Sequence, residues 1–287
     1  MKPSPQLTRR RFIKLGGLLA GSLLASPFAG FGYSRYLEPR LLQVKELTLT
    51  FPRLPSEFNG LRIVQFSDVH LDFHYGLDRL EKLVSRIQNL DPDLVCFTGD
   101  MYDTYIGEEA SGCSRILSRL KAPLGKWAVL GNHDYTAGSR HVAEVMAEGG
   151  FSMLINRSGT IERNGSRLRI AGVDDVLKGS ADLERALPAS TGDLFTILLA
   201  HEPDLADEAL RFPVDLQLSG HSHGGQVRVP FYGAVFTPEY ARKYIDGLFE
   251  LGQGRLKLYV NRGIGVSTHP IRFWCLPELT VFTLRQG

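Results

Sequence analysis

Side chains that commonly bind metal ions recur in five short motifs along this 287-residue chain. The motifs are Asp68-Val69-His70, Gly99-Asp100, Gly131-Asn132-His133-Asp134, Ala200-His201 and Gly220-His221-Ser222-His223. Apart from His133 and Asp134, they supply two carboxylates, one carboxamide and four imidazoles, a donor set that suits two adjacent divalent ions. A metal pair roughly 3.5–4 Å apart acts as a clamp for in-line displacement at phosphorus. His133, beside a ligand, is free to act as an acid, and the motifs together predict a phosphoester hydrolase.

The first three motifs each follow a run of residues typical of a buried strand. These runs are 61–66, before Asp68, 94–98, before Asp100, and 127–130, before Asn132. An apolar stripe at helical spacing follows each of them, over 77–87, 116–120 and 142–146. Alternating strands and helices favour parallel strands with right-handed crossovers, and ligands bind at the carboxyl edge of such sheets. We therefore expect the motifs to meet at one edge.

The second half of the chain has strand-like runs with few helices between them. They are 168–171, 195–199, 216–218, 256–260 and 279–282. We expect these to form a second sheet that faces the first. Residues 44–51 alternate loosely and predict a further strand with one solvated face. No linker or repeat follows residue 40, so residues 41–287 are predicted to form one domain.

The amino terminus has the pattern of an export signal. Thr8-Arg9-Arg10-Arg11-Phe12-Ile13-Lys14 precedes an uncharged stretch, Leu15 to Phe31, and resembles the twin-arginine (Tat) signal of bacteria. A short membrane anchor after a basic start is the alternative. Residues 1–40 are thus assigned to a Tat-like signal or membrane tether, with the Tat translocase as partner. The domain would then lie in the periplasm, the cell wall or on the outer face of the cytoplasmic membrane.

Charge and cysteine content exclude other classes of protein. Five of the 33 basic residues and none of the 31 acidic ones lie in residues 1–30, so the remainder has a formal net charge of −3. A mildly acidic domain argues against nucleic acid as a partner. Cys96, Cys113 and Cys275 lack metal-binding spacing and give no paired framework.

These motifs resemble those of the calcineurin-like metallophosphoesterases. The family blocks D-x-H, G-D-x-x-D, G-N-H-D, a single His and G-H-x-H appear in order, the second being Gly99-Asp100-Met101-Tyr102-Asp103. The resemblance implies an α/β fold, a four-layer α/β/β/α sandwich of two mixed sheets with a binuclear metal site at the strand ends. By resemblance, Asp68, His70 and His223 hold one metal, Asn132, His201 and His221 hold the second, and Asp100 bridges them. His133 would protonate the leaving oxygen, and Asp134 would orient His133 or its loop.

The predicted function is therefore an exported phosphohydrolase that uses a metal-bridging hydroxide, most similar to the Tat-exported bacterial phosphodiesterases. Two divalent ions, Mn, Fe or Zn with Mn favoured, are the expected cofactors. The expected substrate is a phosphoester, with lipid-linked and envelope-linked ones among the candidates. The alternatives are a UDP-2,3-diacylglucosamine-type pyrophosphatase and an inactive metal-binding module. The roles of His74, of Asp174 and of the aromatic segment 231–249 stay open.

Overall fold

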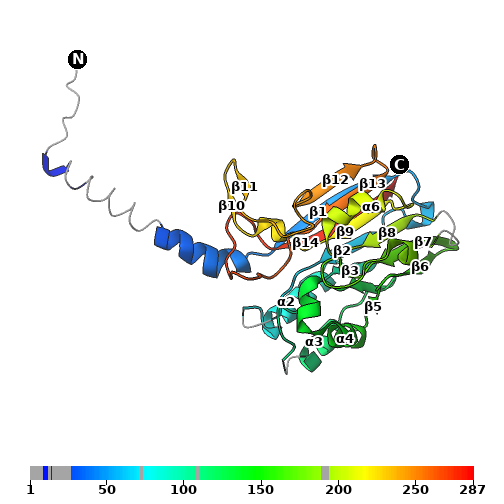
Figure 1. Ribbon diagram of the computed structural model, residues 1–287, viewed down its shortest axis with the longest axis horizontal. Helices are drawn as coiled ribbons and strands as arrows, with labels where there is room; N and C mark the ends of the chain where they lie inside the picture. Colours follow the sequence, from blue (N-terminus) through cyan, green and yellow to red (C-terminus); the bar gives the residue numbers. More distant parts are fainter. Residues whose placement is uncertain (1–8, 12–13, 15–26, 72–73, 108–109, 189–193) are drawn as a thin grey trace, which may run out of the picture.

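The computed structural model describes residues 9–11, 14, 27–71, 74–107, 110–188 and 194–287. Thr8, Phe12 and Ile13 of the Tat-like motif and residues 15–26 of the uncharged stretch lie outside these residues, so the export signal stays a prediction. Within the described ranges, no helix is long and apolar enough to cross a membrane. A helix over residues 27–32 continues into η1 (Tyr33–Leu37) and η2 (Glu38–Arg40) and projects from the rest of the structure (Figure 1).

The first sheet has six strands and carries three helices on one face. Its order is β1 (Gln43–Phe51), β14 (Glu278–Gln286), β2 (Arg62–Phe66), β3 (Leu94–Thr98), β4 (Lys126–Val129) and β5 (Ser152–Met153). Strands β2 to β5 are parallel, and the crossovers between them contain α2 (Leu77–Gln88), α3 (Ala110–Leu117) and α4 (Asn132–Glu148). This part confirms the predicted alternation of parallel strands and helices.

The second sheet also has six strands, of which the central four are parallel. Its order is β12 (Gly247–Leu251), β13 (Leu256–Val260), β9 (Leu216–Ser219), β8 (Thr196–Leu199), β7 (Ser166–Gly172) and β6 (Arg157–Arg163). The two edge strands, β12 and β6, run antiparallel to their neighbours. Shorter elements are η3 (Ser56–Phe58), α5 (Leu183–Ala186), η5 (Pro203–Leu205), α6 (Ala206–Ala209), η6 (His223–Gly225) and the hairpin β10 (Arg228–Val229) and β11 (Gly233–Ala234).

Three apolar cores separate four layers. Val64 and Phe97 of the first sheet pack with Leu80 of α2, on the side of the helices. Side chains of the opposite face, such as Ile63, pack against residues of the second sheet such as Ile197. The outer face of the second sheet is covered by the short helices α5 and α6. The predicted four-layer α/β/β/α sandwich is therefore confirmed (Figure 1).

One strand lies in a different sheet from the one predicted. The run 279–282 forms part of β14, which pairs with β1 in parallel over nine residues and with β2 antiparallel, so it belongs to the first sheet. The prediction was wrong because an apolar run indicates a buried strand but not its neighbours. Instead, the last strand of the chain, β14, pairs with the first, β1.

Candidate metal centre

The five motifs lie at the carboxyl ends of five strands. In the first sheet, Asp68 and His70 follow β2, Asp100 follows β3, and Asn132, His133 and Asp134 follow β4. In the second sheet, His201 follows β8, and His221 and His223 follow β9. All five strands are parallel members of their sheets, so their carboxyl ends meet at one edge of the sandwich. The fold thus brings together residues up to 155 positions apart in sequence.

Ligand atoms gather in overlapping groups at this edge. Within each group the atoms lie within 4.8 Å of one another, and the groups are Asp68, His70 and His223, then His70, Asp100 and His133, then Asp100, His201 and His221. Asp100 Oδ2 lies 3.6 Å from His70 Nε2 and 3.1 Å from His201 Nε2. It therefore stands between the first group and the third, where a bridging carboxylate is expected.

The hydrogen bonds of two histidines direct lone pairs into this space. His201 Nδ1 lies 2.7 Å from the carbonyl oxygen of Thr98, and His221 Nε2 lies 2.8 Å from that of Glu239. Because a carbonyl only accepts, these nitrogens donate, and the other nitrogen of each neutral ring keeps its lone pair. The two remaining nitrogens are 3.2 Å apart. Electron pairs this close to each other and to Asp100 repel unless a cation lies among them.

Two further observations support the fit of a cation. Asn132 Oδ1 is buried and has no hydrogen-bond partner among the described residues, as a metal-ligating oxygen would without its ion. Burial lowers the pKa of His201, but the carboxylate of Asp100 outweighs burial and raises this pKa well above its ordinary value. The carboxylate of Asp100 therefore favours positive charge beside it. Nitrogen and oxygen donors of this kind suit divalent Mn, Fe or Zn.

The backbone at the ligands is as specialised as their side chains. Asp68, His70, Asp100, His221 and His223 all have φ between +48° and +68°. Non-glycine residues are uncommon in this left-handed region, and such strain is concentrated at functional sites. Each turn lets the chain reverse direction directly after its strand while the side chain points at its neighbours.

Glycines beside the ligands allow the loops to approach closely. A Cβ on Gly99 would meet His201 Nδ1 at 2.4 Å, and one on Gly220 would meet Asp68 Oδ2 at the same distance. Gly99 also has φ +96°, which disfavours any other residue. Gly99 therefore permits a tight backbone approach.

Comparison with known proteins places the chain in a family. Residues 61–225 match the model of the calcineurin-like phosphoesterase family, more than half of the chain. An uncharacterized metallophosphoesterase of Bacillus subtilis, YkuE, is 42% identical over 98% of this chain and 99% of its own length. The phosphodiesterase YaeI of Escherichia coli is 29% identical over 97% of this chain and 99% of its own. The UDP-2,3-diacylglucosamine pyrophosphatase LpxG of Chlamydia trachomatis is 31% identical over 90% and 94%.

The chain is a calcineurin-like metallophosphoesterase. As a member of this family it is a phosphoester hydrolase that uses divalent metal ions. Its ligand-type residues cluster at the strand ends, where the motif analysis placed them.

Asp134 of this metallophosphoesterase organises loops, and its carboxylate is not bonded to His133. Its two oxygens accept the backbone N–H groups of Gly131, Asp100, Met101 and Tyr102 at 2.8–3.2 Å. Burial, and next the charge of Asp100, raise the pKa of Asp134 to about 7. Of the two roles predicted for Asp134, orienting the loop is the one that the contacts support.

Asp103 is the residue that the site assignment passed over. Its Oδ1 lies 2.9 Å from His70 Nδ1 and 3.0 Å from His133 Nδ1. Hydrogen bonds from His133 and His70 hold the pKa of Asp103 far below its usual range. Burial lowers the pKa of His133, but the hydrogen bond with Asp103 and the charge of Asp100 outweigh it and raise this pKa to about 9. The signal in the sequence was the last Asp of G-D-x-x-D.

Replacing Asp103 with asparagine is expected to lower kcat for a phosphodiester by about 10–100-fold, the usual cost of removing a carboxylate that orients site histidines. The asparagine amide carries no negative charge, so it cannot accept hydrogen bonds from the His70 and His133 rings and at the same time keep His133 protonated. The measurement is kcat over a pH range with metal content determined in parallel. Unchanged kcat with full metal content would contradict this role.

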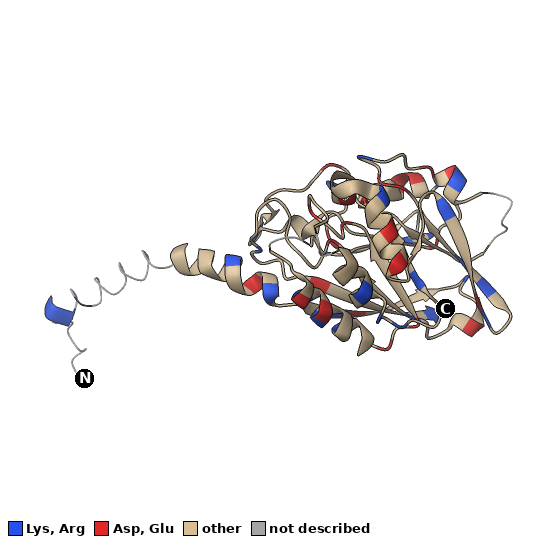
Figure 2. Cartoon of the chain, turned by 90° about the horizontal axis from the view of Figure 1, so that it is seen from below, with Lys and Arg blue, Asp and Glu red and all other residues tan. Residues whose placement is uncertain are grey.

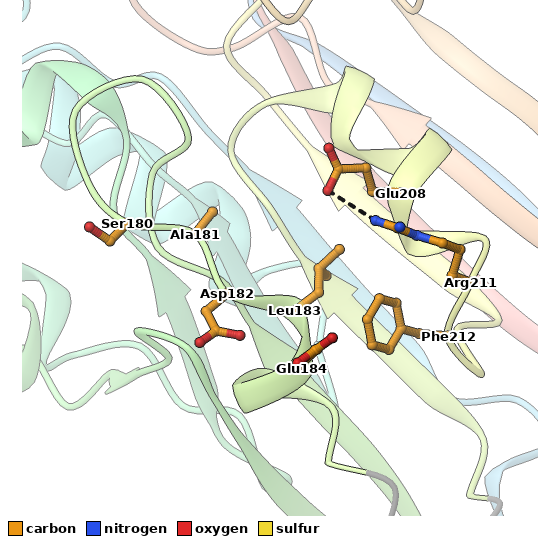
Figure 3. Close-up of a pocket in the computed structure, with 8 residues that line it drawn as sticks. All are labelled: Ser180, Ala181, Asp182, Leu183, Glu184, Glu208, Arg211 and Phe212. Atoms are coloured by element: carbon orange, nitrogen blue, oxygen red, sulfur yellow. Dashed lines mark ion pairs between the residues drawn. The ribbon is translucent and has the colours of Figure 1, made fainter.

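The remaining sequence candidates lie outside the ligand groups. His74 Nδ1 lies 3.4 Å from Arg35 Nη2. Asp174 accepts the hydroxyl of Tyr135 at 2.6 Å and the N–H of Ser180 at 3.0 Å, so it ends a strand and fixes a loop. A hollow of about 500 Å³ beside α5 and α6 contains an ion pair between Glu208 and Arg211 but no residue of the five motifs (Figure 3). It belongs to the outer helical layer of the fold.

Proposed function

We propose that this metallophosphoesterase is an exported phosphodiesterase with two metal ions, preferably Mn, held by the seven predicted ligands. The observation that carries the proposal is the position of Asp100, which contacts ligand groups on both sides and has His133 next to it. When bound, two divalent ions would activate water and offset the negative charge of the phosphoryl group.

His133 is placed to deliver a proton. Its Nδ1 lies against the carboxylate and carbonyl oxygens of Asp103, which leaves Nε2 to face away from this partner. The hydroxyl of Ser267 lies 3.3 Å from Nε2, and the His133 side chain is about a quarter exposed. With a pKa of about 9 the ring is cationic at neutral pH. It then donates its proton from Nε2 to the departing oxygen.

Support for a diester and for export comes from different parts of the chain. The relative from Escherichia coli carries the name phosphodiesterase and matches nearly the whole chain. The twin-arginine-like start, with no acid before residue 38, supports a location outside the cytoplasm. The predicted ligands and His133 are all present in the sequence, which argues against an inactive binding module.

The test uses the full chain loaded separately with Mn, Fe or Zn. We expect turnover of bis-p-nitrophenyl phosphate to exceed that of p-nitrophenyl phosphate, with Mn most active. Faster turnover of the monoester would contradict the diesterase, and failure of both substrates with all three metals would contradict hydrolysis.

A pyrophosphatase is tested in the same assay with UDP-2,3-diacylglucosamine. We expect little turnover of this compound relative to the diester. Release of UMP at a higher kcat/KM than for the diester would replace the proposed substrate class. Export is tested by fusing residues 1–40 to a reporter that folds before translocation, with Arg9, Arg10 and Arg11 replaced by lysine as the control.

A further inference from the structure

Large aromatic side chains are exposed in three segments that are far apart in sequence. Phe231 is fully exposed, and Tyr232, Phe236 and Trp274 are each more than 60% exposed. Phe28 and Phe31 project in the same way from the helix that begins at residue 27. We call these six residues the aromatic rim. Exposed aromatic side chains grouped in this way mark a site of interaction, because single exposed residues are ordinary but clusters are not.

The hairpin of the rim begins and ends at the metal centre. It leaves from His223, whose carbonyl accepts the N–H of Gln226, and β10 follows directly. It returns at Glu239, whose carbonyl accepts His221 Nε2 at 2.8 Å. Phe231 and its neighbours therefore lie on a short excursion between two contacts of metal-binding histidines.

Trp274 lies on a second segment, residues 263–275, which we call the strap. In its first part, the N–H of Gly265 donates a hydrogen bond to the carbonyl of Asp68 at 2.7 Å. In its last part, Cys275 Sγ donates a hydrogen bond to the carbonyl of His223 at 3.1 Å. Arg272 is fully buried and donates to carbonyls of the strap, among them those of Gly265 and Cys275. The strap is thus closed by hydrogen bonds, and Trp274 precedes Cys275, which contacts His223 of the metal centre.

The strap also joins the helix to the hairpin. Arg272 N donates to the carbonyl of Ser34 at 2.9 Å, and Cys275 N donates to the buried carboxylate of Glu38. On its other side Phe273 accepts from Arg228 N and forms a bridge with Val227. The helix and the hairpin consequently lie on the same side of the molecule (Figure 1).

The charges of these segments favour one kind of partner. Residues 27–37, 227–238 and 263–275 contain three arginines and no acidic residue. Figure 2 shows the helix uncharged except near its attachment to the domain. The helix is also the end of the uncharged stretch Leu15 to Phe31, which leads into this face. Phe, Tyr and Trp without acids are typical of surfaces at the lipid–water interface, which repels carboxylates and accepts aromatic rings.

We propose that the aromatic rim inserts into the interfacial layer of a lipid bilayer and holds the metal centre toward that surface. Its substrate is then the phosphodiester of a lipid that stays in the membrane, a conclusion that rests on the proposed diesterase function. The hairpin and the strap border the acyl part of this lipid, and the ligands at the strand ends face its phosphate.

Trp274 is a built-in reporter of insertion. The chain has two tryptophans, and Trp127 is half-buried in the core. In the Trp127→Phe variant, phosphatidylglycerol vesicles with bromine near the head of the acyl chain should quench Trp274 fluorescence. Vesicle-bound protein whose Trp274 is not quenched would overturn the proposal, even if the amino-terminal segment tethers it. Should Trp127→Phe fail to fold, the difference in fluorescence quenching between the wild type and the Trp274→Phe variant reports the insertion of Trp274 instead.

Removing the rim tests its contribution. The triple variant Phe231→Ser, Tyr232→Ser, Phe236→Ser is expected to weaken vesicle binding at least about tenfold, because each residue loses buried apolar area at the interface. Leu248→Ser, which removes an exposed apolar side chain of β12 outside the rim, is the matched control and should bind as the wild type does. Equal binding by the triple variant would overturn the proposal.

The two proposals fail in different ways. Turnover of soluble bis-p-nitrophenyl phosphate needs no membrane, so this assay of the wild type tests the diesterase separately from vesicle binding. Absence of this turnover in the wild type would refute the proposed diesterase function. The insertion of the aromatic rim would still be tested by the quenching of Trp274. A dimer that the triple variant converts to a monomer, with vesicle binding unaltered, would show that the rim contacts a second copy and would overturn the membrane proposal.

Discussion

Asp100→Asn is expected to reduce the metal content from about two ions per chain to about one or fewer and to lower kcat by a factor on the order of 10³. Among the ligand groups of the described residues, only the carboxylate of Asp100 lies beside both His70 and His201. His201 and His70 outweigh the effect of burial and keep the pKa of Asp100 far below its usual range, so it is a full negative charge. An amide has the same shape but removes this charge from between two cations.

The matched control is Asp91→Asn. Asp91 has φ +47°, close to the +61° of Asp100, but it is exposed and lies outside the ligand groups. Both substitutions therefore make the same chemical change in the same backbone conformation. Elemental analysis after gel filtration gives the metal content, and full occupancy in Asp100→Asn would show that this carboxylate does not bridge.

His133→Ala is expected to keep both metals and to lose activity by about 10²–10⁴-fold, the range for loss of a general acid. The loss should depend on the leaving group. p-Nitrophenolate departs without help, whereas an alkoxide needs a proton, so the deficit should be larger for an alkyl phosphodiester than for bis-p-nitrophenyl phosphate. Measuring kcat for both substrates separates proton donation from a structural effect.

His141→Ala serves as the control because His141 lies on the same helix, α4, and is exposed. It should turn over both substrates like the wild type. If His133→Ala lost activity equally on both substrates, proton donation would be ruled out, and if it lost metal, His133 would be a ligand instead. The second ligand group, in which His133 joins His70 and Asp100, makes this last outcome a real test.

The sequence was sufficient to predict that the motif residues meet, because residue type and position at the end of a strand are visible in it. Buried runs before Asp68, Asp100 and Asn132 indicated strands, and parallel strands bring their carboxyl ends to one edge. No tertiary information was needed to expect that these residues meet. The same logic failed for β14, because hydrophobicity reports burial and says nothing about which strand is the neighbour.

Asp103 shows a different limit. Its position in G-D-x-x-D was visible, yet its contact with both His70 and His133 depends on how the loop after β3 folds back. Equally, the aromatic segment 231–249 could be read as a lip or as packing from the sequence alone. Tyr244 is buried in the outer core, so packing accounts for this residue, while the tip is exposed and its role as a lip stays a prediction.

The sequence by itself determined the class of chemistry, because it places carboxylates, an amide and imidazoles at strand ends and leaves one further histidine as the predicted acid. Residue type sets which ion is bound and which proton is available, and strand periodicity sets the edge. Only the tertiary structure decided which carboxylate stands between the ligand groups, and that the strap places Trp274 next to the hairpin and the helix. Those outcomes depend on contacts between residues up to about 240 positions apart, such as Glu38 with Cys275, and no local pattern encodes such a contact.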